Sequence, residues 1–176
     1  FGAGQLARRM NIPFRSGGGL CGSKLPDAQA AYESANTLNA AMLGGVNFML
    51  HSCGWLEGGL VSSFEKFVMD ADQLGSLQKM SLGVSADENA QAMGAIREVG
   101  PSGHYLGCEH TQNNFKSAFW RSDVFDYKPF ETWYEEGARD TAKLASERVT
   151  RQLADYQQPP LDPNILVALE KYVAQK

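Results

Sequence analysis

The 176-residue chain is long enough for one domain with a sizeable core, and its 43% hydrophobic and 20% charged residues are typical of a globular protein. Its net charge is −4, and no basic cluster exceeds Arg8-Arg9, which argues against nucleic acid as a partner. No apolar run reaches the ~18 residues of a membrane span. The cysteines at positions 21, 53 and 108 have no tight spacing. They indicate a reducing compartment, so we expect a cytoplasmic protein.

The first strand, loop and helix carry an unusual run of glycines. Residues Ile12–Arg15 predict a short strand, Gly17, Gly18 and Gly19 follow it, and Pro26 begins a helix that runs to Leu43. Glycine can adopt positive φ and leaves space beside the backbone, so we expect a ligand to approach this loop. The loop has no nucleotide-binding pattern. A long connection without any ligand is the alternative interpretation.

A second strand, loop and helix follow. The apolar run Val46–His51 predicts a strand, and residues 53–59 form the loop at its end. A capping box from Ser62 to Glu65 begins the next helix. We expect the buried stripe of that helix to consist of its apolar residues, namely Phe64, Phe67, Val68, Ala71 and Leu74.

The remaining sequence is mostly helical. We expect a helix from the capping box at Ser85 to about Glu98, an extended segment at His104–Leu106 and a short helix within 111–120. One long helix is predicted over 129–156, and Asp162-Pro163 caps a last helix that ends at Val173.

Together these elements predict an α/β fold. Residues 1–125 form a partial α/β barrel segment, and residues 126–176 are a helical extension of the same domain. Two or three strands cannot close a (β/α)8 barrel, which needs eight. The chain is therefore either a smaller α/β layer or the carboxyl-terminal portion of a TIM-type barrel.

The residues that could carry chemistry lie at the predicted strand ends, where parallel strands would bring them to one mouth. A metal site would use the histidines and cysteines there, namely His51, Cys53, His104, Cys108 and His110. Their spacing matches no tight zinc pattern. A pocket for a quaternary ammonium would instead use the aromatic faces of Trp55 and Tyr105. Core packing is the alternative interpretation for these aromatic residues, and a structural, hydrogen-bonded role is the alternative for His51 and His104.

Several collinear motifs carry a family resemblance. They are Arg15-Ser-Gly-Gly-Gly-Leu20, Ser23-Lys-Leu-Pro-Asp-Ala-Gln-Ala30, Tyr32-Glu-Ser34, Gly54-Trp-Leu-Glu-Gly-Gly-Leu60, Phe64-Glu-Lys-Phe-Val68, Ile96-Arg-Glu-Val-Gly100, Gly103-His-Tyr-Leu-Gly107, Phe115-Lys-Ser-Ala-Phe-Trp-Arg121 and Pro160-Leu-Asp-Pro163. The chain resembles the carboxyl third of the trimethylamine methyltransferase family. That resemblance implies a (β/α)8 barrel and transfer of a methyl group from a methylated amine to the cobalt of a partner corrinoid protein.

Founding members of that family use pyrrolysine to activate a tertiary amine, and the resemblance places that residue near the strand end with Arg15 to Gly19. No nonstandard residue occurs in this sequence, so we expect a non-pyrrolysine member and a quaternary amine such as a betaine as methyl donor. Its leaving group is already a neutral tertiary amine. The expected substrate-binding residues are Arg15, Gly17, Gly18, Gly19, His51, Trp55, His104 and Tyr105. Arg15, the glycine amides and His104 are the candidates for holding a betaine carboxylate.

We further expect no covalently bound corrinoid, a homo-oligomer, and no turnover by these 176 residues alone. Two alternatives stay open. One is a zinc-dependent enzyme that uses His51, His104 and Cys108. The other is a non-catalytic assembly module with the predicted helix 129–156 as its oligomer surface.

Overall fold

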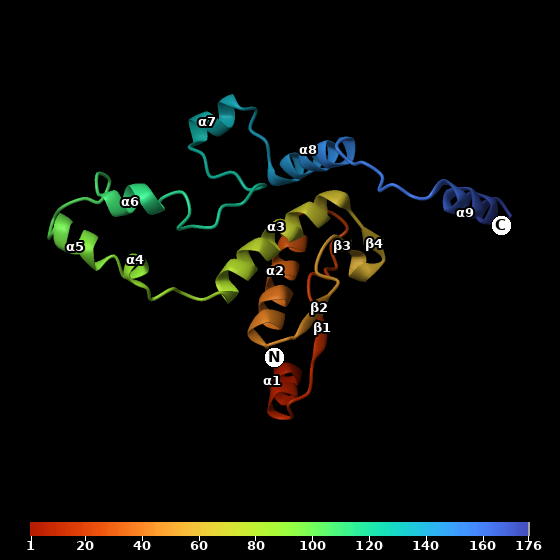
Figure 1. Cartoon of the computed structure of the whole chain (residues 1–176), viewed down its shortest axis with the longest axis horizontal. Coiled ribbons are helices and arrows are strands. Elements are labelled where there is room, and N and C mark those ends of the chain that lie inside the picture. The colour runs from red at the N-terminus through yellow and green to blue at the C-terminus, as the bar shows by residue number, and fades with distance from the viewer. Residues whose placement is uncertain (176) are drawn as a thin grey trace.

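The computed structural model describes residues 1–175, which form mostly helices together with two two-stranded sheets (Figure 1). The elements in chain order are α1 (Gly2–Arg9), β1 (Arg15–Gly17), α2 (Ala28–Leu43), β2 (Phe48–Leu50), β3 (Trp55–Leu56), the 3-10 turn η1 (Glu57–Gly59), β4 (Val61–Ser62), α3 (Phe64–Ser81), α4 (Glu88–Gln91), α5 (Met93–Val99), α6 (Glu109–Asn114), α7 (Phe130–Glu135), α8 (Thr141–Ala154) and α9 (Pro163–Ala174).

The first two strands form the unit that positions the candidate site. β1 pairs with β2 in parallel, with Ser16 opposite Met49, and α2 connects the two strands. Parallel strands need such a crossover helix. The predicted order of strand, loop and helix, repeated twice, is therefore confirmed. β3 and β4 form a separate antiparallel ladder inside the second loop. Residues 1–175 contain no closed barrel, since β1 and β2 are the only parallel pair that the structure describes there.

Capping residues set the limits of α2 and α3. Asp27 caps α2 by accepting a hydrogen bond from the Ala30 N–H, so the helix begins two residues after Pro26. Ser63 caps α3 by accepting from the Lys66 N–H, one residue later than the capping box predicted. The predicted cap, Ser62, instead belongs to β4 and donates its hydroxyl to the Gly54 carbonyl.

The buried face of α3 differs from the predicted stripe. Val68 and Leu77 are buried as apolar residues, but Phe64 and Phe67 are exposed. The face that packs on α2 instead buries a charged pair, Lys66 and Asp70. The prediction was right for Val68 and wrong for Phe64 and Phe67, because it assigned the core face by side-chain hydrophobicity alone.

The core has two parts. One cluster contains Cys21, Ala30 and Leu56, and it joins the loop after β1 to α2 and β3. The other lies where α8 packs across α3, and its buried members are Val68, Val124 and Ala145. α8 therefore belongs to the same packed body as the two strand–helix units.

The predicted long helix over 129–156 is two helices. The chain turns at Gly137 and Ala138, which have φ of 97° and 49°, and Asp140 then caps α8. Helical periodicity does not detect a left-handed break of this kind. The helix expected from residue 85 likewise divides at Ala92, where φ is 51°, into α4 and α5.

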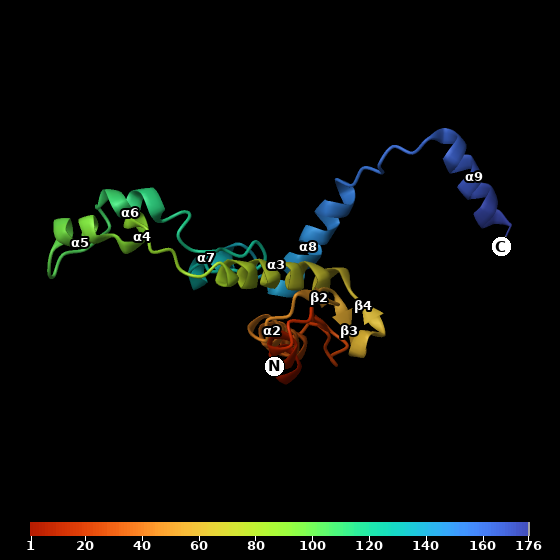
Figure 2. The same ribbon diagram turned by 60° about the horizontal axis from the view of Figure 1, so that its bottom comes forward.

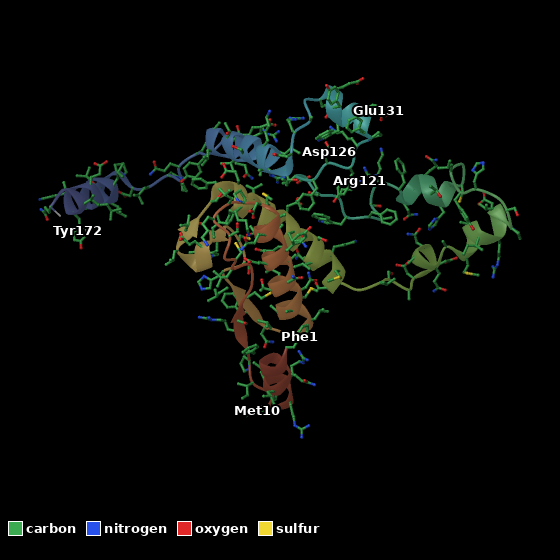
Figure 3. The ribbon with its side chains drawn as sticks, turned by 180° about the vertical axis from the view of Figure 1, so that it is seen from behind. Phe1, Met10, Arg121, Asp126, Glu131 and Tyr172 are labelled. Carbon is green, nitrogen blue, oxygen red and sulfur yellow. The ribbon has the colours of Figure 1, made fainter. Side chains whose placement is uncertain are left out.

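Two segments extend away from the packed body (Figures 1 and 2). The segment with α4, α5 and α6, called the arm here (residues 83–119), lies to one side, and α9 lies to the other. Seen from behind, Tyr172 on α9 is remote from Phe1 and Met10 at the ends of α1, whereas Arg121 and Asp126 lie where the arm returns to α8 (Figure 3). α9 begins at Pro163 with Asp162 as its cap, as the sequence predicted.

Across residues 1–175, every helix is too short or too polar to cross a membrane.

Candidate functional site

The loop after β1 and the loop after β2 meet at the carboxyl ends of the parallel pair. We call residues 17–25 the glycine loop and residues 51–59 the tryptophan loop. The Gly18 N–H donates to the Leu50 carbonyl at 3.1 Å. Further along, the Glu57 N–H donates to Ser23 O at 2.8 Å and the Gly58 N–H to Cys21 O at 2.7 Å. The two loops therefore form one backbone-bonded unit.

Glycine is required in the first loop for space and not for backbone conformation. A Cβ on Gly19 would lie 2.6 Å from the Ser52 carbonyl oxygen, and one on Gly18 would lie 2.6 Å from Leu38 Cδ2. A Cβ on Gly17 would meet nothing closer than 3.8 Å. None of the three has positive φ, so none of them uses the left-handed conformation that glycine allows. Close approach of the loop to the end of β2 is what excludes larger residues.

An aromatic pair lies on the tryptophan loop. The rings of His51 and Trp55 meet edge to face, with centroids 5.3 Å apart and planes inclined by 70°. His51 is exposed and has φ of 55°, and Trp55 is half-buried. The Cys21 thiol donates to the Trp55 carbonyl at 3.2 Å, which ties the pair to the glycine loop. Exposed aromatic faces at such a loop can hold an organic cation. Arg15 lies in β1 of the same sheet and is exposed, opposite Phe48 in the register.

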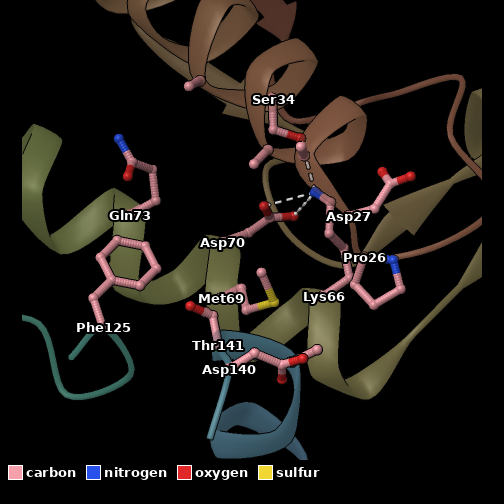
Figure 4. Close-up of a pocket in the computed structure, with 14 residues that line it drawn as sticks. Pro26, Asp27, Ser34, Lys66, Met69, Asp70, Gln73, Phe125, Asp140 and Thr141 are labelled. Carbon is pink, nitrogen blue, oxygen red and sulfur yellow. Dashed lines mark hydrogen bonds and ion pairs between the residues drawn. The ribbon is translucent and has the colours of Figure 1, made fainter. Parts of the chain in front are cut away.

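A buried ionic network lies beneath both loops, and the sequence reasoning missed it (Figure 4). Lys66 Nζ contacts both carboxylate oxygens of Asp70, at 2.6 and 2.5 Å, and the Ser34 hydroxyl at 2.8 Å. Asp70 also accepts from the Gly54 N–H at 2.9 Å. The available signal was the four-residue spacing of Lys66 and Asp70, which places both side chains on one helix face.

Burial dominates the protonation equilibria around this network. It raises the pKa of the Asp70 carboxyl, because lost hydration outweighs the bonds from Lys66 and Gly54. Burial, with the nearby Asp70 charge, also raises the pKa of the Cys53 thiol to about 11. Cys53 is therefore a thiol and not a thiolate at neutral pH, which makes it a poor nucleophile.

A cavity of about 360 Å³ lies between α2, α3 and the start of α8 (Figure 4). Its lining is mostly apolar and includes Met69 and Phe125, while Ser34, Lys66 and Asp70 form its polar wall. It opens between helices and not between the strand ends. The network thus separates this interhelical cavity from the two loops.

The structure does not bring every predicted site residue together. Gly17–Gly19, His51 and Trp55 share the two-loop unit, but His104 and Tyr105 lie in the arm, between α5 and α6. The expected strand at His104–Leu106 does not form. The chain turns there, with the Cys108 N–H donating to the Tyr105 carbonyl at 3.1 Å, and the segment pairs with no strand among residues 1–175. Convergence of His104 and Tyr105 with the strand ends was therefore a wrong expectation.

The residues proposed for zinc are likewise dispersed. Cys108 is buried immediately before α6, and His110 Nε2 lies 2.7 Å from the Asn89 carbonyl oxygen within the arm. Within residues 1–175, no group of three His, Cys, Asp or Glu side chains is close enough to share one metal ion.

A parallel strand pair with both loops at its carboxyl edge places the chain in the α/β class, in which ligands bind at that edge. The family model for trimethylamine methyltransferase (MTTB) matches residues 1–176. The chain therefore belongs to the trimethylamine methyltransferase family.

Three named relatives match the chain over nearly its whole length. The chain is 44% identical to the glycine betaine methyltransferase of Desulfitobacterium hafniense over 98% of its own residues and 36% of that protein. It is 30% identical to the proline betaine:corrinoid methyltransferase of Eubacterium limosum over 97% of the chain and 36% of that protein. Identity to a trimethylamine methyltransferase of D. hafniense is 29%, over 99% of the chain and 35% of that protein. The chain spans about a third of the length of these relatives.

Proposed function

We propose that the protein to which this chain contributes transfers a methyl group from a quaternary amine of the betaine class to the cobalt of a corrinoid protein. The observation that carries this proposal is the 44% identity to a glycine betaine methyltransferase, against 29% to a trimethylamine methyltransferase over nearly the same residues. Two further relatives are named as proline betaine and L-carnitine:corrinoid methyltransferases.

Methyl transfer from a betaine does not need a general acid or a general base. When the C–N bond breaks, the nitrogen keeps the electron pair and leaves as a neutral tertiary amine. The methyl group would pass to the cobalt, and the reduced corrinoid would supply both electrons of the new C–Co bond. No proton moves in that step. The protein's contribution is to hold the methyl group in line with the acceptor and to shield the cation from water.

The proposed substrate site is the unit of the glycine and tryptophan loops. Trp55 and His51 offer the ring faces that attract a trimethylammonium group. Arg15, exposed on the same sheet, supplies the positive charge for the carboxylate. The Gly18 amide is already bonded to Leu50, so among the glycine amides it does not serve this purpose. His104 and Tyr105 are outside the proposed site, since both lie in the arm.

The cobalt is proposed to arrive on a separate corrinoid protein and not as a group bound to this chain. We also propose that these 176 residues are one part of a (β/α)8 catalytic domain and do not transfer methyl groups alone. The order β1–α2–β2–α3 supports the barrel. The chain spans about a third of the glycine betaine methyltransferase, which supports the proposal that it lacks residues needed for methyl transfer. A homo-oligomer of the complete protein is proposed as well.

A methyl-transfer assay with the full-length protein and a reduced corrinoid partner protein tests the proposal. The cobalt spectrum reports methylation, and mass spectrometry identifies the amine product. We expect glycine betaine to yield dimethylglycine and trimethylamine to be a poor donor. Methylation by trimethylamine with none by any betaine would overturn the proposal.

A further inference from the structure

The buried pair Lys66 and Asp70 lacks a role in the proposed chemistry. Lys66 is 1% exposed and Asp70 4%, and Lys66 is among the largest fully buried side chains of the described chain. Charged residues are rarely buried so completely. A buried ion pair stabilises a fold little compared with apolar residues of the same size, because both charges lose hydration. Stability alone therefore does not account for the pair.

The hydrogen bonds of the pair lead in two directions. Ser34 accepts from Lys66 and donates its own hydroxyl proton to the Gly19 carbonyl at 3.1 Å. Asp70 accepts from the Gly54 N–H at 2.9 Å. A continuous chain of bonds thus runs from Gly19 to Gly54, through side chains of α2 and α3.

The hydrogen-bond network ends at two backbone positions, Gly19 and Gly54, that are tightly constrained by their neighbours. Gly19 approaches the Ser52 carbonyl so closely that it tolerates no Cβ. Gly54 has φ of 81° and precedes Trp55 directly, and its carbonyl accepts from the Ser63 N–H at 3.0 Å. Any shift at one end of the network would therefore displace either the glycine loop or the residue that carries the indole.

We propose that Lys66 and Asp70 are positioning residues that hold the glycine loop and Trp55 in a fixed relation for binding the quaternary amine. The proposal rests on the proposed function and adds a role that is separate from substrate contact. Lys66 Nζ contacts the Ser34 hydroxyl and both carboxylate oxygens of Asp70, and all three contacts lie within the network. The pair acts through Gly19 and Gly54.

The decisive test separates positioning from stability. In the full-length protein, the double variant Lys66→Met/Asp70→Leu replaces the ions by apolar residues of similar size, which preserves folding in comparable cases. We expect its Tm to stay near that of the unchanged protein, while the KM for glycine betaine rises roughly tenfold to a hundredfold. Lys79→Met makes the same lysine replacement at an exposed site on α3 and is expected to change neither value.

Hydrogen–deuterium exchange supplies a readout that does not depend on activity. We expect residues 17–25 and 51–59 to exchange faster in the double variant, with α2 and α3 unchanged. A double variant that retains the original KM and exchange rates would overturn the positioning role. If the unchanged protein uses no quaternary amine but the two loops still lose protection, the proposed function fails and the structural coupling stands. Should the double variant not fold, Asp70→Asn, which keeps an acceptor for Gly54, is expected to show the same exchange change in milder form.

Discussion

A series of alanine substitutions at the three glycines tests the packing of the two loops. Gly19→Ala introduces a Cβ 2.6 Å from the Ser52 carbonyl oxygen and 3.0 Å from its carbonyl carbon, both backbone atoms of the tryptophan loop just after β2. Gly17→Ala introduces a Cβ whose nearest neighbour is 3.8 Å away, an ordinary van der Waals contact, and serves as the matched control. Gly18→Ala is expected to destabilise the protein by an intermediate amount. Its 2.6 Å contact is with the end of the Leu38 side chain, which can shift more easily than backbone although it is fully buried.

The expected loss in the free energy of unfolding follows from those contacts. Overpacking a rigid site costs about 1–3 kcal/mol. Replacing glycine also removes unfolded-state freedom, which stabilises each variant alike by about 0.4–1 kcal/mol. The free energy of unfolding of Gly19→Ala is therefore expected to lie about 1–3 kcal/mol below that of Gly17→Ala. Each kcal/mol corresponds to about 2–4 °C in Tm for a cooperative unit of about 150–250 residues.

Thermal unfolding of the full-length variants at one scan rate measures their order of stability. We expect Gly17→Ala to be the most stable variant, Gly18→Ala the next and Gly19→Ala the least stable. Equal Tm values for Gly17→Ala and Gly19→Ala would refute the close approach of the glycine loop to Ser52.

Three further predictions concern binding, thiol reactivity and pH. Trp55→Ala should raise the KM for glycine betaine roughly two- to thirtyfold, because it removes about 0.5–2 kcal/mol of cation–π attraction. Trp55→Phe should retain most of the affinity. An unchanged KM in the alanine variant would show that Trp55 is not part of the site. Cys53, whose pKa is about 11, should be alkylated by iodoacetamide at pH 8 far more slowly than a small free thiol, and rapid labelling in a mass-spectrometric time course would contradict its burial. Hydrogen bonds from the Ala30 N–H and Ser23 lower the pKa of Asp27, so its stabilising contribution is complete above its ordinary pKa of 3.8 and is lost as the pH falls through the lower folded value. Asp27→Asn should therefore flatten the acid side of the stability profile, and an unaltered profile would show that this cap is not linked to acid unfolding.

The sequence was informative where local signals determine the structure. Asp162-Pro163 marked the start of α9, and the predicted end of the first long helix at Leu43 is the end of α2. The parallel pairing of the first two strands followed from the strand–loop–helix order. The Gly17–Gly19 run and Trp55 were singled out correctly as parts of one loop unit.

Long-range packing and backbone reversals were not predictable in the same way. Nothing local distinguishes Ala92 or Ala138 as left-handed residues, so the breaks between α4 and α5 and between α7 and α8 were missed. The Lys66–Asp70 pair resembles an ordinary solvated pair on a helix until α2 covers it and brings Ser34 to the lysine. The prediction that His104 lies near the other strand ends depended on a strand at residues 104–106, and residues 1–175 form no strand there.

A crystal structure of the full-length protein with glycine betaine bound tests the central claim most directly. We predict that the trimethylammonium group lies against the rings of Trp55 and His51, on the unit that the glycine and tryptophan loops form, with the carboxylate toward Arg15. Betaine bound elsewhere, for example in the interhelical cavity beside Met69 and Phe125, would contradict the proposed site.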